Sequence, residues 1–211
     1  MAKKEQERKL TPAEEKRKIR FDEISAELEE QGYRKTQLTI GLVSANLILV
    51  LIGIPFLILS MFLFFHINGT VDLSFGAVKT LSLIAVMIVL TVIHELIHGA
   101  AWSLFCENGW KDIDFGFIVQ YLTPYCTCAT PLPRWSYVIG ALAPLVILGV
   151  VPYIIGMFSC SAYVFFLGII MILAAGGDIM LTIKLLKFKA EGSEVLVYDH
   201  PTEAGSVVFD R

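Results

Sequence analysis

The residues best suited to chemistry are two histidines and a glutamate inside an apolar stretch. His94, Glu95 and His98 form the pattern H-E-x-x-H. On a helix, residues four apart share a face with Cβ atoms about 5–6 Å apart, so both imidazoles can bind one metal ion. Glu95 lies on the adjacent flank, where its carboxylate can act as general base toward a metal-bound water. The spacing therefore predicts a metal site that activates water for hydrolysis.

A catalytic zinc ion needs a third protein ligand and one open position. Asp178 is the candidate, because it and Glu95 are the only acidic residues in the apolar segments of the chain. A charge inside a bilayer is costly and therefore suggests a function. His98 and Asp178 are also predicted at similar depths in their segments. We expect His94, His98 and Asp178 to bind Zn²⁺; the alternative for Asp178 is a hydrogen-bonded packing residue.

The composition is that of a membrane protein. Hydrophobic residues make up 55% of the 211 residues and charged residues 18%, with a mean hydropathy of +0.67, whereas globular chains average about 25% charged residues. The net charge of -3 gives no sign of a nucleic-acid partner. Four apolar segments are long enough for a bilayer core, which needs about 20 helical residues: Leu38–His66, Leu81–Phe105, Tyr137–Met157 and Ala162–Ile183.

The charges gather before the first apolar segment. More than half of the 17 lysines and arginines lie within residues 1–36. A helix is predicted to begin there at Thr11, with Glu14 completing a capping box, and to end at Gly32. Its apolar stripe consists of Phe21, Ile24 and Leu28. This amphipathic helix is expected to lie on the membrane or on a partner, or else to be a solvated lead-in helix.

Two further regions do not resemble spans. Between the second and third spans, alternate residues are apolar, which favours a strand pair or re-entrant hairpin; these residues are Phe115, Phe117, Val119 and Tyr121. The stretch 113–121 could hold an extended substrate by edge pairing. After the fourth span, the short apolar runs Val195–Tyr198 and Val207–Phe209 predict a small ordered tail.

The predicted fold class is an all-α integral membrane protein. It has four transmembrane helices, a short cytoplasmic β-hairpin-like insertion between the second and third, and the N-terminal amphipathic helix. Residues 1–36 form a charged cytoplasmic segment, 37–189 the four-span domain, and 190–211 a short cytoplasmic tail. Lysines and arginines flank the first and fourth spans on the side of the termini, which places both termini in the cytoplasm.

Other candidate ligands are a cysteine pair and a histidine. Cys126 and Cys128 could bind a metal, but a lone C-x-C lacks the second half of a zinc site. His200 could be a fourth ligand or a proton shuttle, although a surface or turn role is favoured. The four cysteines, which include Cys106 and Cys160, do not form the pattern of a disulfide framework.

Several motifs together resemble a known group of enzymes. His94–His98, Gly140–Pro144 and Gly176–Asp178 resemble the site-2 protease superfamily of intramembrane metalloproteases. The closer similarity is to a bacterial family of putative zincin peptidases, which the following segments also resemble: Glu30–Tyr33, Thr123–Cys128 and Asp199–Pro201.

The resemblance implies a zinc-dependent peptidase in the bacterial plasma membrane. It implies that His94 and His98 are ligands, Glu95 the catalytic base and Asp178 the third ligand. Site-2 proteases usually have Gly after the Asp, with Asn and Pro upstream, whereas glycines precede Asp178 here and no such Asn is present.

The predicted function is hydrolysis of peptide bonds, at or within the membrane, by metal-activated water with Glu95 as general base. The partners are then the lipid bilayer and a membrane protein or peptide substrate, and homo-oligomer formation stays open. One alternative is a catalytically silent, metal-binding membrane scaffold or regulator. Another is a small transporter, for which few polar groups outside the site are present.

Overall fold

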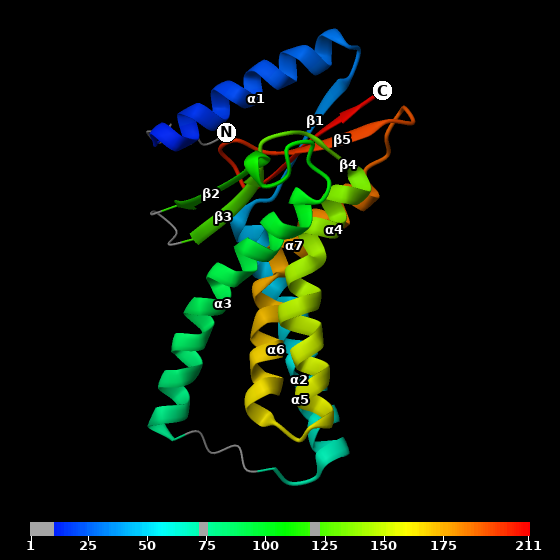
Figure 1. The fold of residues 1–211 in the computed structure, drawn as a ribbon. Coiled ribbons are helices and arrows are strands. Elements are labelled where there is room, and N and C mark those ends of the chain that lie inside the picture. Colours follow the sequence, from blue (N-terminus) through cyan, green and yellow to red (C-terminus); the bar gives the residue numbers. More distant parts are fainter. Residues whose placement is uncertain (1–10, 72–75, 119–122) are drawn as a thin grey trace.

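The computed structural model describes residues 11–71, 76–118 and 123–211, and shows a bundle of helices with strands gathered beyond one of its ends (Figure 1). The long helices are α2 (Leu42–Asn68) and α3 (Ala77–Ser103). A third helical segment runs without a break through α4 (Arg134–Pro144), the π-helical stretch η3 (Leu145–Val150) and α5 (Val151–Phe158). The fourth is a pair, α6 (Ala162–Ala174) and α7 (Gly176–Lys187), bent by 47°.

These helices correspond to the four predicted apolar segments. Within the described residues, three are long and apolar enough to cross a membrane, and the bent pair supplies a fourth if it counts as one span. Most of their large apolar side chains face outward, including Leu81, Ile88 and Val92 on α3. Leu38 was assigned to the first span, but it lies in a strand, and α2 begins only at Leu42.

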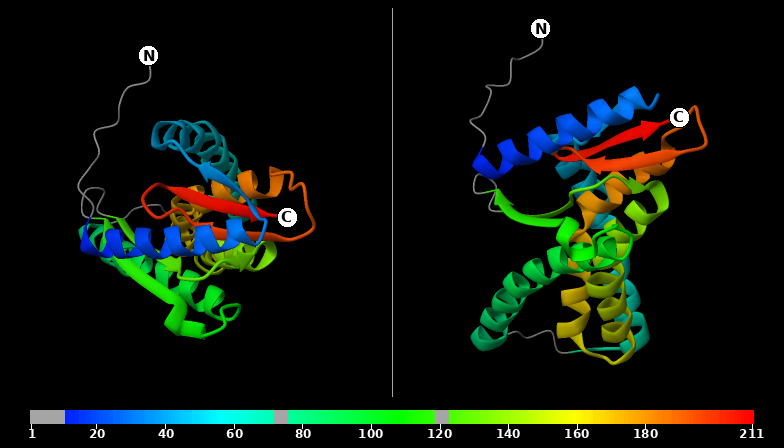
Figure 2. Two further views of the ribbon diagram at one scale, coloured as in Figure 1. Left: turned by 90° about the horizontal axis from the view of Figure 1, so that it is seen from above. Right: turned by 45° about the horizontal axis from the view of Figure 1, so that its top comes forward.

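Close helix packing holds α5 against α6. A Cβ atom added at Gly156 would lie 2.2 Å from the backbone nitrogen of Phe165, and one added at Gly168 would lie 2.3 Å from that of Tyr153. Only glycine permits so short an approach between two backbones. By contrast, α3 leans away from α5 and α6 at the end far from the strands (Figures 1 and 2).

The chain is mostly helical, as predicted, but the expectation of an all-α fold needs correction, because a four-stranded antiparallel sheet covers one end of the helices. Its order is β1 (Arg34–Thr39), β6 (Gly205–Asp210), β5 (Val195–Asp199) and β4 (Leu132–Pro133). The tail runs were expected to be ordered, and they are β5 and β6. β6 pairs with β1, so a strand that follows the N-terminal helix lies beside the last strand, and a partner so distant in the sequence leaves no local signal.

The N-terminal helix α1 (Pro12–Glu30) packs on this sheet (Figure 2). Its capping box of Thr11 and Glu14 is present as predicted, and Gly32 ends the turn with φ of +88°. The predicted apolar stripe faces the protein itself: Phe21 and Leu28 are buried in one cluster with sheet residues. The stripe is therefore occupied by the protein's own sheet, and α1 packs on the protein rather than standing apart as a lead-in helix.

The predicted hairpin is present between α3 and α4. A short 3₁₀ turn, η1 (Gly109–Asp112), leads into β2 (Ile113–Ile118), which pairs with β3 (Thr123–Cys128). Phe115 and Phe117 lie in β2 and are exposed. Val119 and Tyr121 fall outside the described residues. The hairpin lies against α3, so the helix with the H-E-x-x-H pattern contacts strands at its sheet end.

Candidate metal centre

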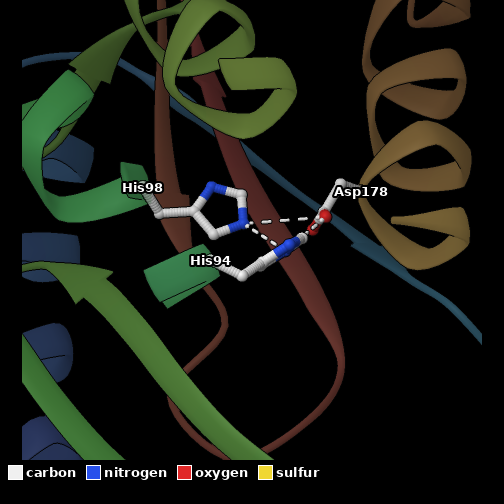
Figure 3. A group of neighbouring side chains, drawn as sticks. All are labelled: His94, His98 and Asp178. Carbon is white, nitrogen blue, oxygen red and sulfur yellow. Dashed lines mark hydrogen bonds and ion pairs between the residues drawn. The ribbon is translucent and has the colours of Figure 1, made fainter. Parts of the chain in front are cut away.

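Three side chains from two helices converge on one point (Figure 3). His94 and His98 project from α3, and Asp178 reaches them from α7. The two Nε2 atoms are 3.1 Å apart, and Asp178 Oδ2 lies 3.2 Å from His94 Nε2 and 3.6 Å from His98 Nε2. In the described part of the chain, these form the one group of three side chains placed to hold an ion. The structure thus brings together all three predicted ligands.

The spacing of these atoms fits a tetrahedral ion. Zinc binds imidazole nitrogen and carboxylate oxygen at about 2.0–2.2 Å, so two ligand atoms of a tetrahedral site lie about 3.3–3.6 Å apart. The observed separations of 3.1, 3.2 and 3.6 Å scatter around that value. Three such ligands leave a fourth position open, as in catalytic zinc sites. The residues present therefore fit zinc.

The backbone of α4 fixes the orientation of His98. Its Nδ1 lies 2.9 Å from the carbonyl oxygen of Gly140, which can only accept, so Nδ1 carries the proton and the Nε2 lone pair faces the metal position. That carbonyl is available because Pro144, four residues on, has no N–H to donate to it. The next backbone N–H, that of Leu145, donates to the Leu142 carbonyl and not to that of Gly140.

An aromatic stack supports the other face of His98. The Trp102 ring lies parallel to the imidazole at 5.1 Å and stacks in turn on Tyr137 at 5.3 Å. Trp102 Nε1 donates to the Tyr137 carbonyl at 3.0 Å. A Cβ atom on Gly140 would lie 2.0 Å from the Trp102 ring, so glycine is required for this stack. Gly140 thus serves both the stack and the hydrogen bond to His98.

We predict that Pro144→Ala weakens zinc binding without unfolding the protein. The new N–H would compete with His98 Nδ1 for the Gly140 carbonyl. Loss of such an outer hydrogen bond costs about 10–100-fold in metal affinity. Competition with a zinc chelator would measure this change. Pro152→Ala in α5 is the matched control, because it changes a helical proline away from the site; an equal loss in both variants would contradict the assignment.

Asp178 reaches the histidines because the chain bends between α6 and α7. The break at Ala175 starts a new helix, α7, and puts Asp178 in its first turn, where the helix dipole stabilises a carboxylate. The two preceding glycines differ: a Cβ on Gly176 would meet Leu49 of α2 at 2.8 Å, whereas Gly177 has open space around it. Of the two glycines, therefore, only Gly176 lies against a neighbouring helix.

Glu95 lies between the metal group and the hairpin. It follows His94 on α3 and is partly buried. The backbone N–H of Cys126, on β3, is directed at its carboxylate. Glu95 is absent from the group of three converging ligands, which leaves its carboxylate available as a base.

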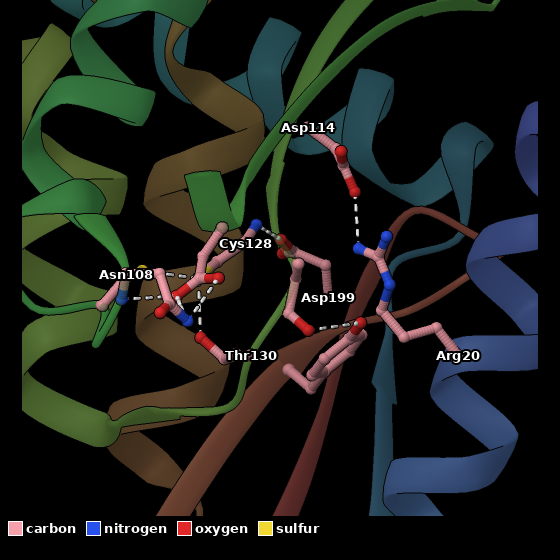
Figure 4. A network of polar contacts seen from close by, with 10 residues as sticks. Arg20, Asn108, Asp114, Cys128, Thr130 and Asp199 are labelled. Atoms are coloured by element: carbon pink, nitrogen blue, oxygen red, sulfur yellow. Dashed lines mark hydrogen bonds and ion pairs between the residues drawn. The ribbon is translucent and has the colours of Figure 1, made fainter. Parts of the chain in front are cut away.

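A buried carboxylate to which the sequence analysis assigned no role, Asp199 at the end of β5, lies behind the site (Figure 4). The Tyr137 hydroxyl donates to Asp199 Oδ1 at 2.6 Å, and the Cys128 backbone N–H donates to Oδ2 at 3.3 Å. Burial raises the pKa of the Asp199 carboxyl, and the bond from Tyr137 opposes that shift. Through Tyr137 and Trp102, this carboxylate joins the tail strand to the stack that supports His98.

His200 has a turn role and is not among the converging ligands. Its Nδ1 accepts backbone N–H bonds from Thr202 at 3.3 Å and Glu203 at 2.9 Å, within the turn between β5 and β6. Burial lowers the pKa of the imidazole below its ordinary value of 6.5. The neutral ring is therefore the form that the fold favours.

This gives a pH-dependent prediction for stability. Because the folded pKa of His200 is lowered, the unfolded chain takes up the proton first as pH falls below 6.5. The contribution of the neutral His200 ring to the free energy of unfolding is thus fully present above that pH and decreases as the pH falls below it. The wild type should lose apparent melting temperature between about pH 7 and 5, and His200→Asn, which keeps an acceptor without titrating, should lose less. Equal losses in both proteins would contradict the assigned role.

Comparison with known proteins yields one match. A family model described as "Putative zincin peptidase" matches residues 87–192, a stretch that includes His94, Glu95, His98 and Asp178. The matched stretch runs from within α3 to just beyond α7, so α1, β1, β5 and β6 lie outside it. No curated protein and no solved structure matches the chain.

Proposed function

The chain belongs to the putative zincin peptidase family, and from this premise we propose that it is a zinc peptidase embedded in a membrane. Its substrates are membrane proteins or membrane-associated peptides, in which it hydrolyses peptide bonds. The observation that carries the proposal is the convergence of His94 Nε2, His98 Nε2 and Asp178 Oδ2 at separations that suit one tetrahedral zinc ion.

His94, His98 and Asp178 would hold the zinc ion. Bound there, zinc supplies Lewis acidity, which lowers the pKa of a water and polarises the scissile carbonyl. The Glu95 carboxylate takes the proton of the attacking water and later delivers it to the leaving amine nitrogen. Gly140 and Trp102 hold His98 in the tautomer and orientation that ligation needs.

The proposed membrane position follows from the apolar helices and the distribution of positive charge. The sheets and the C-terminus lie beyond one end of the helices (Figure 1). Between the first two spans, Lys79 is the one Lys or Arg. At the sheet end lie Arg34, Lys35, Lys111, Arg134, Lys184, Lys187 and Lys189. By the positive-inside rule this end is cytoplasmic, as are both termini, and the metal group lies near it.

The substrate segment is proposed to bind as an extended chain beside β3. The sequence favoured residues 113–121 for this role, but β3 is the strand whose outward N–H, at Cys126, is directed at Glu95. An extended peptide could take over that donor and bring its carbonyl groups to the Glu95 flank of the metal group. A helical substrate must first unwind, because its carbonyls are bonded internally.

The experiment that tests the proposal is a cleavage assay in proteoliposomes. Zinc-loaded protein is mixed with membrane-anchored peptides, and products are found by mass spectrometry. Products that disappear on chelation and return with zinc support a peptidase. A fully zinc-loaded protein that cuts none of the peptides would instead support the metal-binding scaffold or regulator.

A further inference from the structure

A pair of cysteines, separate from the metal centre, lies where α3 meets the hairpin. Cys106 follows the end of α3 by three residues, and Cys128 is the last residue of β3. Their Sγ atoms are 2.8 Å apart. Since a disulfide has an S–S length of about 2.05 Å, the two sulfurs need to approach by only about 0.8 Å. The fold therefore brings together two thiols that are distant in sequence.

The surroundings suit a thiol pair better than a metal site. Cys126 is buried nearby on the same strand, but no group of three cysteines in the described ranges is close enough to share an ion. Cys128 is buried, and this burial, followed by the contact with Cys106, raises its pKa to about 12. Cys106 is only partly buried, so it is the thiol that solvent species can reach.

We propose that Cys106 and Cys128 are a modification site at which a reversible disulfide forms by exchange with a low-molecular-weight disulfide. The Cys106 thiol gives its proton to solvent, and its sulfur attacks one sulfur of the small disulfide, which breaks and releases a thiolate. The Cys128 sulfur, once deprotonated, attacks the Cys106 sulfur, forms the protein disulfide and releases the second thiolate. The two released thiolates take up two protons, so two protein thiols are oxidised and one small disulfide is reduced.

The bond would join the segment that directly follows α3 to β3, the strand beside Glu95. It closes the loop between Cys106 and Cys128, which contains η1, β2 and β3. Both ends are already in contact, so the bond fixes the observed arrangement. A cross-link of this kind restricts the unfolded chain and should raise the apparent melting temperature. In a reducing cytoplasm the thiols persist, and the bond forms when small disulfides accumulate.

The test uses the purified full-length protein in detergent, treated with oxidised glutathione and digested without reduction. We expect a peptide pair that joins Cys106 to Cys128, lighter by two hydrogens than the separate peptides and split by dithiothreitol. The pair should be absent from Cys106→Ser and Cys128→Ser, and retained in Cys126→Ser and Cys160→Ser.

The exposed Cys160 serves as an internal control for the oxidant. If Cys160 becomes glutathionylated while Cys106 and Cys128 remain thiols, the proposal is wrong. A cross-link between Cys126 and Cys128 in place of the expected pair would also overturn it. Loss of the expected pair in Cys126→Ser, with the melting temperature unchanged, would assign the chemistry to Cys126 and likewise contradict it.

Discussion

Replacing Glu95 by Gln is expected to slow peptide cleavage by at least about 100-fold while leaving zinc bound. The amide keeps the size of the side chain and its place between the metal group and the Cys126 N–H, but it cannot accept a proton from water. General-base catalysis contributes about 10²–10⁴-fold, so turnover should fall by that factor. Cleavage rates in proteoliposomes and zinc content on the same preparation measure both halves of the prediction.

The control for this variant is Glu107→Gln, which makes the same change at an exposed position after α3. It should cleave at the wild-type rate. If Glu95→Gln cleaves as fast as the wild type with zinc present, Glu95 is not the base. If it loses zinc as well, then Glu95 acts on the metal group and the separation of roles fails.

Removing any one of the three proposed ligands should have the second large effect. Outer hydrogen-bond partners of ligands contribute about 10–100-fold to metal affinity, so loss of a ligand itself should exceed about 100-fold. We expect His94→Ala, His98→Ala and Asp178→Ala each to lose stoichiometric zinc and with it all cleavage. Metal analysis after gel filtration at limiting zinc would measure this.

Asp178→Ala is the most informative of these variants, because Asp178 belongs to another helix. Its control is Asp22→Ala, an exposed aspartate on α1 that should keep full zinc. Retention of zinc by Asp178→Ala would show that the carboxylate is a packing residue. Circular dichroism should confirm that both proteins remain helical, since Asp178 also bonds His94 across the bundle.

The sequence contains local signals for most of the metal group. The i, i+4 spacing puts His94 and His98 on one helix face, and charge inside an apolar segment points to Asp178. The alternation around Phe115 likewise predicts the hairpin. In each case the signal lies within a short stretch of sequence.

What could not be predicted depends on contacts between distant segments. The apolar Leu38 was placed in the first span, yet its strand pairs with β6 near the other end of the chain. The bond of Tyr137 to Asp199 and the approach of Cys106 to Cys128 also require the folded arrangement. The role of Pro144 becomes visible only once His98 is seen beside the Gly140 carbonyl.

The central claim is that His94, His98 and Asp178 hold one zinc ion at the sheet end of the helices. X-ray absorption at the zinc edge, recorded on the purified protein, tests this claim most directly. The account predicts nitrogen and oxygen neighbours at about 2.0–2.2 Å, with the scattering pattern of two imidazoles. A shell of sulfur neighbours at about 2.3 Å would place the metal on the cysteines instead and contradict the account.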